Sequence, residues 1–108
     1  ILKKAPNSQA YSGLGFVFRQ QGKLDLAVEN FKGAIKADPK NAIAYGQLGA
    51  IQVEQKKLEE AVSTYQLLVS NQPSAAAHEE LAKVLKLLGR TKQANEQLKQ
   101  AKAMKSAE

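Results

Sequence analysis

The sequence predicts an all-α protein built from three helical hairpins. The segment Tyr11–Gly15 recurs 34 residues later as Tyr45–Gly49, and a weaker copy, His78–Ala82, follows after 33 residues. A period of this length is typical of helical repeats. Within each repeat, apolar and small residues recur at three- and four-residue spacing, which places them on one face of a helix.

Two helices are expected in each repeat, and polar residues mark where the first of them begins. Asn7 or Ser8, then Asn41 and Ser74, stand where a side-chain oxygen can accept a hydrogen bond from a free N–H group of the first turn. The expected helices cover residues 8–21, 24–37, 42–55, 58–71, 75–88 and 91–104.

Glycines are expected at the turn inside each hairpin. Gly22 and Gly89 occupy this place in the first and third repeats, where a residue that tolerates positive φ is favoured. Lys56 takes the same place in the second repeat, so this turn is expected to be either strained or differently shaped. Pro39 and Pro73 close the first two repeats and end the preceding helix.

Small residues at matching positions are expected to let the two helices of a hairpin approach closely. Those on the first helices are Gly15, Gly49 and Ala82, and those on the second helices are Ala27, Ala61 and Ala94.

These spacings resemble the tetratricopeptide repeat family. The first repeat matches its pattern at Tyr11, Leu14, Gly15, Phe18, Gly22, Ala27, Phe31, Ala34 and Pro39. The second repeat carries Gln52, Lys56 and Leu68 where the pattern has an aromatic residue, Gly and Ala. The resemblance implies a right-handed α-α superhelix of three antiparallel hairpins, whose first helices line a concave wall. It also implies an adaptor function, since most members of the family bind other proteins.

The register divides the chain into repeats at residues 8–41, 42–74 and 75–108. Residues 1–7 are expected to be the tail of a helix from a preceding repeat, so the N-terminus is interpreted as cut. The last helix carries Asn95, Gln100 and Lys102 where the second repeat has apolar residues. A polar outer face is typical of a terminal repeat, so the C-terminus is interpreted as natural.

The residue types present predict a protein without catalytic residues, metal or cofactor. The absence of cysteine excludes a disulfide, a thiolate nucleophile and a cysteine metal site. His78 is the one histidine of the chain, and it stands where the other repeats place Tyr11 and Tyr45, so a packing role is expected. In Glu59–Glu60 and Glu79–Glu80 the neighbouring side chains point about 100° apart on a helix, so neither pair forms a facing dyad.

The concave groove is the expected binding site for a peptide or helix of a partner protein, in a scaffold that aids assembly of a multiprotein complex. Its centre is expected to be apolar and its flanks charged, which suits an apolar segment with some negative charge. The expected partner-binding residues are Gln9, Ser12, Phe16, Arg19, Ile43, Gly46, Ala50, Val53, Glu54, Glu79, Lys83 and Lys86.

Some relatives bind the terminal carboxylate of a chaperone tail with a clamp of Lys, Asn and Arg. The matching positions here hold Ser12 and Phe16, then Gln47, then Ala76 and Glu80. All five depart from the pattern, so no such clamp is expected. Self-association through the N-terminal end is a further expectation.

A basic surface that binds nucleic acid or an anionic membrane is the alternative function. Residues 81–108 carry seven Lys or Arg residues against two Glu residues. However, this segment has no aromatic residue for base stacking, and its sizeable apolar side chains for a membrane are few. A protein partner is therefore favoured. The absence of cysteine fits a reducing compartment, and a cytoplasmic location is expected.

Overall fold

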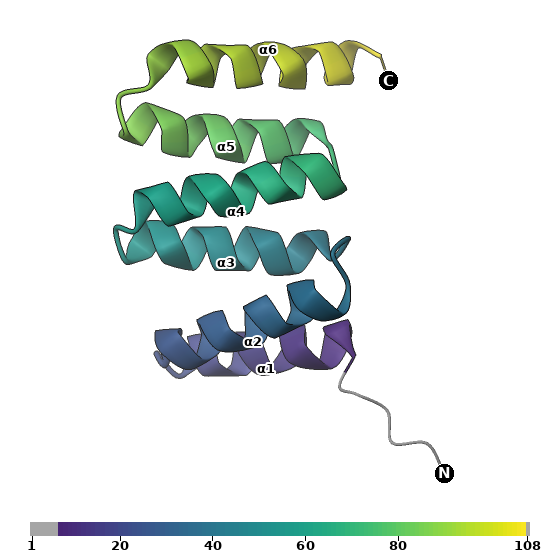
Figure 1. Ribbon diagram of the computed structural model, residues 1–108, viewed down its shortest axis with the longest axis vertical. Coiled ribbons are helices and arrows are strands. Elements are labelled where there is room, and N and C mark those ends of the chain that lie inside the picture. The colour runs from purple at the N-terminus through teal and green to yellow at the C-terminus, as the bar shows by residue number, and fades with distance from the viewer. Residues whose placement is uncertain (1–6, 108) are drawn as a thin grey trace.

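The computed structural model describes residues 7–107, so the predicted tail at residues 1–6 lies outside the described part of the chain (Figure 1). Six helices follow one another through short connections. They are α1 (Ser8–Gln20), α2 (Leu24–Ala37), α3 (Ala42–Glu54), α4 (Leu58–Asn71), α5 (Ala75–Leu87) and α6 (Thr91–Ser106). The expected helix limits are confirmed, the largest difference being at the end of α6.

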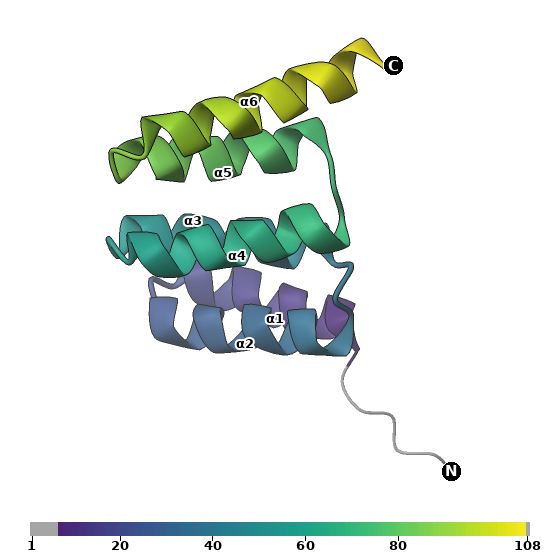
Figure 2. The same ribbon diagram turned by 45° about the horizontal axis from the view of Figure 1, so that its top comes forward.

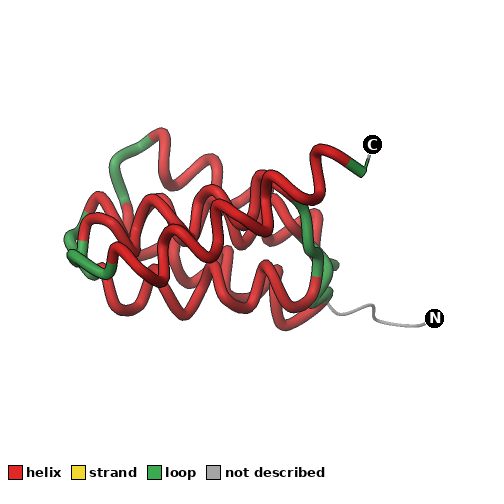
Figure 3. Tube along the Cα trace, turned by 90° about the horizontal axis from the view of Figure 1, so that it is seen from above, coloured by secondary structure: helices red, strands yellow, loops and turns green. Residues whose placement is uncertain are grey.

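The helices stack in chain order as three antiparallel hairpins, α1–α2, α3–α4 and α5–α6. Each helix contacts the one before it and the one after it. In Figure 2, α2 and α4 lie in front of α1 and α3, so the first and second helices of these hairpins form two sides of the stack. Seen from above, the connections gather at the two ends of the helices (Figure 3).

The first helix of each hairpin begins at the expected capping residue. The side-chain oxygen of Asn7 accepts a hydrogen bond from the N–H of Ala10, and Asn41 and Ser74 accept equivalent bonds three residues ahead. These bonds satisfy N–H groups that have no partner inside the helix.

The three turns inside the hairpins share one hydrogen-bond pattern. In the first turn, the N–H of Lys23 donates to the carbonyl of Phe18 at 2.8 Å, and the other two turns have the corresponding bond at the same length. Gly22 and Gly89 have a φ of 77°, and Lys56 has a φ of 62°. The turn at Lys56 therefore has the same shape as the others and places a side chain in the left-handed region, which L-residues disfavour.

Glycines on the first helices make room for aromatic rings from the second helices. A Cβ atom at Gly15 would lie 2.8 Å from the ring of Phe31, and one at Gly49 would lie 2.4 Å from Cζ of Tyr65. The atoms closest to these glycines thus belong to the aromatic residues rather than to Ala27 and Ala61.

The core consists of two clusters that join neighbouring hairpins. One includes Phe31 of α2 with Leu48 and Ile51 of α3, and the other includes Tyr65 of α4 with Leu81 of α5. Burial of these faces is the main stabilising term for such a stack. It also holds α1, α3 and α5 side by side, which positions the predicted groove.

Candidate functional site

The predicted groove residues do not form one continuous channel but border three separate hollows. The first hollow has a volume of about 530 Å³ and lies between α1, the α2–α3 connection and the start of α3. Of the predicted residues, it is lined by Gln9, Ser12, Phe16 and Ile43.

Two large apolar side chains are open to solvent in the first hollow. Phe16 is 39% exposed and Ile43 is 62% exposed. The ring of Phe16 packs edge-on against Phe31, with the ring centroids 5.5 Å apart. Since Phe31 is fully buried, this contact holds the Phe16 ring in place while its other face remains accessible.

A polar network that the sequence did not reveal supports the floor of the first hollow. The amide of Asn41 donates to the hydroxyl of Ser8 at 2.7 Å and to that of Ser12 at 3.1 Å, while Ser8 donates to the carbonyl of Ala34 at 2.8 Å. Asn41 was expected only as a cap for α3. The hydroxyl of Ser12 is therefore engaged within the protein, and Ser12 is buried.

The second hollow has a volume of about 280 Å³ and lies between the C-terminal halves of α3 and α5, with α4 behind them. Of the predicted residues, it is lined by Ala50, Val53, Glu54 and Lys83; the others in its wall are Tyr65, Glu80, Val84 and Leu87. Leu87 is 62% exposed, so this hollow also offers an accessible apolar side chain.

Tyr65 was expected only as a packing residue, and the structure places it in the wall of the second hollow. Its side chain is 3% exposed. Burial raises the pKa of Tyr65 to about 12; the charge of Glu80 raises it further, and that of Arg19 opposes the rise. The phenol group is therefore neutral at ordinary pH.

Arg19 lies between the two hollows and is paired inside the protein. Its guanidinium group forms an ion pair with Glu54 and donates a hydrogen bond to the side-chain oxygen of Gln47. Both contacts link α1 to α3. The predicted positive flank at Arg19 is thus largely neutralised, whereas Gly46 remains open, because a Cβ atom there would meet nothing within 4 Å.

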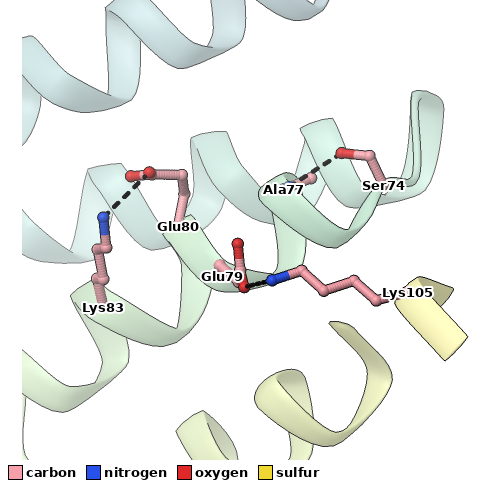
Figure 4. Close-up of polar contacts among 6 residues, drawn as sticks. All are labelled: Ser74, Ala77, Glu79, Glu80, Lys83 and Lys105. Atoms are coloured by element: carbon pink, nitrogen blue, oxygen red, sulfur yellow. Dashed lines mark hydrogen bonds and ion pairs between the residues drawn. The ribbon is translucent and has the colours of Figure 1, made fainter. Parts of the chain in front are cut away.

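The remaining predicted residues face a third hollow on the other side of α5. This α5–α6 hollow has a volume of about 390 Å³ and is lined by Glu79, Ala82, Lys83, Lys86 and Leu98. Figure 4 shows that Glu79 of α5 points toward Lys105 of α6, which donates to its carboxylate at 2.7 Å. Only Lys83 borders both this hollow and the second one.

Catalytic and metal-binding arrangements are not found in the part of the chain that the structure describes. His78 is half-buried, and its Nδ1 lies 2.7 Å from the side-chain oxygen of Gln97. A ring nitrogen facing an amide oxygen acts as a donor, so this contact fits the expected packing role. Within residues 7–107, no group of three or more His, Cys, Asp or Glu side chains is placed to hold a metal ion. None of the described helices has the length and apolar character needed to cross a membrane.

Comparison with solved structures gives several close matches in fold. The crystal structure of MamA superposes with a TM-score of 0.86 and 20% identity, over 94% of this chain and 60% of that chain. The N-terminal domain of stress-induced protein-1 from C. elegans matches with a TM-score of 0.81 and 20% identity, over 90% and 83% of the two chains. The second tetratricopeptide domain of Spaghetti (RPAP3), bound to an HSP90 peptide, matches with a TM-score of 0.78 and 20% identity, over 90% and 91%.

These matches concern the fold, and the chain spans only 60% of the length of the MamA chain. A search of curated protein sequences finds no match. The family model described as tetratricopeptide repeat matches residues 18–84, well over half of the chain. Domains of this kind typically mediate protein–protein interaction and typically have no catalytic activity. The chain therefore belongs to the tetratricopeptide repeat family.

Proposed function

We propose that this protein is a non-catalytic scaffold that binds a peptide or helix of a partner protein in the concave groove and so aids assembly of a multiprotein complex. The observation that carries the proposal is the exposed pair Phe16 and Ile43 in the first hollow. An accessible apolar strip bordered by polar residues is typical of a binding surface.

The first hollow suits an apolar anchor residue of the partner. The Phe16 ring is held by Phe31, so little side-chain freedom is lost when a ligand covers it. Lys40 also lines this hollow, beside Asp38, and it supplies a positive charge for a partner segment with some negative charge. A helical ligand would present apolar residues at three- and four-residue spacing.

The second hollow extends the proposed site toward α5. Ala50, Val53 and Leu87 offer apolar contact, and Lys83 stands at the border of the hollow. The Arg19–Glu54 ion pair separates the two hollows, so an extended segment would cross this pair and place one apolar residue on each side of it.

The proposed ligand is not a chaperone tail held by its terminal carboxylate. The second domain of Spaghetti is bound to the HSP90 peptide SRMEEVD, but the clamp positions in this chain hold Ser12, Phe16, Gln47, Ala76 and Glu80. Gln47 is already bonded to Arg19. A peptide of that sequence is therefore expected to bind no better than one without its terminal carboxylate.

The rival function, binding of nucleic acid or an anionic membrane by the basic C-terminal third, has less support. The described part of α5 and α6 carries no aromatic side chain for stacking on bases. We place the protein in the cytoplasm, on the lack of cysteine; fractionation of cells with an antibody to the chain tests this.

Capture of partners with the chain, followed by titration of the purified partner, tests the groove. Ile43→Ser is the informative variant, because a side chain that is 62% exposed contributes little to stability. Leu67→Ser is the matched control, since Leu67 is 52% exposed and lines a hollow between α2 and α4 instead.

The proposal expects about tenfold weaker binding for Ile43→Ser and unchanged binding for Leu67→Ser. Phe16→Ala is expected to cost more, about 2 kcal/mol of binding free energy. If Leu67→Ser abolishes binding while Ile43→Ser binds as the parent does, the partner uses the side of the second helices and the concave groove is not the site.

A further inference from the structure

The α5–α6 hollow differs in chemistry from the matching surfaces of the first two hairpins. In the second hairpin, Val53 and Val69 pack against the cluster shared with the third hairpin. The residues 33 positions later are Lys86 and Lys102. The surface that joins the second hairpin to its neighbour is thus apolar, whereas its counterpart on the third hairpin carries lysines.

The positions of α6 fix which side chains border this hollow. Leu98 lines it directly, and Lys105 reaches Glu79 across it (Figure 4). Lys102 lies one turn beyond Leu98 and on the same helix face. Lys102 therefore adds a positive charge at the α6 edge, opposite Lys83 and Lys86 at the α5 edge.

The positive charge around the hollow is not balanced by the carboxylates near it. Glu79 is paired with Lys105, and Glu80 is paired with Lys83 at 3.3 Å, through side chains that are 44% and 71% exposed. Within residues 7–107, no carboxylate lies within 4.0 Å of the amino group of Lys86 or Lys102. The floor, in contrast, is apolar, being made of Ala82 and the half-buried Leu98.

We propose that the α5–α6 hollow is a second interaction surface, which binds an acidic segment of a partner protein through an apolar side chain flanked by carboxylates. The apolar side chain would cover Leu98, while the carboxylates would lie near Lys86 and Lys102. This goes beyond the proposed function, because the hollow lies on the opposite side of α5 from the second hollow and takes a ligand of different charge.

A peptide fits this surface better than a nucleic acid does. A phosphate backbone carries charge continuously and would meet Glu79 within the hollow and Glu80 beside it. It would also leave Leu98 without an apolar contact, and the hollow lacks an aromatic side chain on which a base could stack. A peptide can alternate acidic and apolar residues to match lysines around a leucine.

The probe for the test is a fluorescently labelled synthetic peptide in which a leucine is flanked on both sides by glutamates. Control peptides replace the glutamates by glutamines or the leucine by serine, and oligothymidylate tests the response to phosphate. Binding is measured by fluorescence anisotropy with the whole chain. The tested variant is Lys86→Gln/Lys102→Gln, and the matched control is Lys23→Gln/Lys36→Gln, which removes the same charge from exposed positions on or next to α2.

The proposal expects about tenfold weaker binding of the acidic peptide to Lys86→Gln/Lys102→Gln and unchanged binding to the control variant. Binding should also weaken from about 0.1 M to about 1 M salt, as the Debye length falls from about 10 Å to about 3 Å. Both control peptides should bind more weakly than the probe.

Three outcomes would overturn the proposal. Equal weakening by the two double variants would show that only net charge matters. Oligothymidylate binding as tightly as the peptide would assign the lysines to nucleic acid. Loss of peptide binding in Ile43→Ser, with the lysine variant unaffected, would place the peptide in the first hollow and leave the proposed function intact.

Discussion

Lys56 holds a backbone conformation that favours glycine, in the turn between α3 and α4. A side chain in this region costs about 1–2 kcal/mol, and glycine recovers most of this while adding an entropic cost of about 0.5–1 kcal/mol. We predict that Lys56→Gly raises the free energy of unfolding by about 0.5–1 kcal/mol, measured by urea denaturation. The reverse change in the first turn, Gly22→Lys, should lower it. A Lys56→Gly protein no more stable than the parent would show that the turn is not strained.

Tyr65 makes stability depend on pH in the alkaline range. Tyrosine ionises near pH 10 in an unfolded chain, and burial raises the pKa of Tyr65 to about 12 in the folded protein. The folded state thus holds this proton more tightly, so the stabilising contribution is present below pH 10 and is lost as pH rises through about 12. The two-unit shift corresponds to about 2–3 kcal/mol.

We predict that the free energy of unfolding of the parent falls more steeply between about pH 9 and about pH 12 than that of Tyr65→Phe. Urea denaturation at each pH measures the difference. Burial also raises the pKa of Tyr45, but that residue is present in both proteins and its effect cancels in the comparison. An identical loss of stability in both proteins would contradict a raised pKa at Tyr65.

At the scale of the helices, two glycines of α3 have opposite surroundings. A Cβ atom at Gly49 would lie 2.4 Å from the ring of Tyr65, whereas one at Gly46 would meet nothing within 4 Å. We predict that Gly49→Ala lowers the free energy of unfolding by about 1–3 kcal/mol, because the ring must move. Gly46→Ala should raise it by about 1 kcal/mol through helix propensity. Thermal melts followed by circular dichroism measure both, and equal effects of the two changes would refute the close packing at Gly49.

The polar bonds around Asn41 show how one residue can act on three helices. It caps α3, and its amide reaches Ser8 and Ser12 of α1, while Ser8 in turn bonds the last turn of α2. A side chain that satisfies buried polar groups on neighbouring elements fixes their relative position. Asn41 therefore sets the width of the first hollow as well as the start of a helix.

At the scale of the whole molecule, the outer face of α1 differs from its counterparts. Leu48 and Ile51 of α3 are 4% and 0% exposed, and Leu81 and Val84 of α5 are each 2% exposed. The equivalent residues of α1, Leu14 and Val17, are 50% and 47% exposed. The face that α2 and α4 cover on the next two hairpins is thus open on the first.

We predict that the chain self-associates through this face, because burying exposed leucine and valine side chains gains about 25 cal/mol per Å². Analytical ultracentrifugation at increasing concentration should show association, and Leu14→Lys/Val17→Glu should abolish it. Leu67→Lys, a change at an exposed leucine on α4, is the control and should associate as the parent does. A parent protein that remains monomeric at high concentration would contradict the prediction.

The sequence by itself determined the six helices, their limits and the family. Each of these depends on local signals, such as the cap at Ser74, the glycine at position 22 and the three- and four-residue spacing. Such signals act within a few residues along the chain, and the 34-residue period repeats them, so they are readable without knowledge of distant contacts.

Only the tertiary structure decided how the predicted groove is divided. Arg19 is neutralised by Glu54, Ser12 is bonded to Asn41, and Glu79 turns toward Lys105. Each of these contacts joins residues 26 to 35 positions apart, on different helices. Their formation depends on the angle and spacing at which the hairpins stack, which periodicity along one helix does not specify. The helix pattern therefore named the side chains near the groove, and packing between the hairpins determined which of them remain open to a partner.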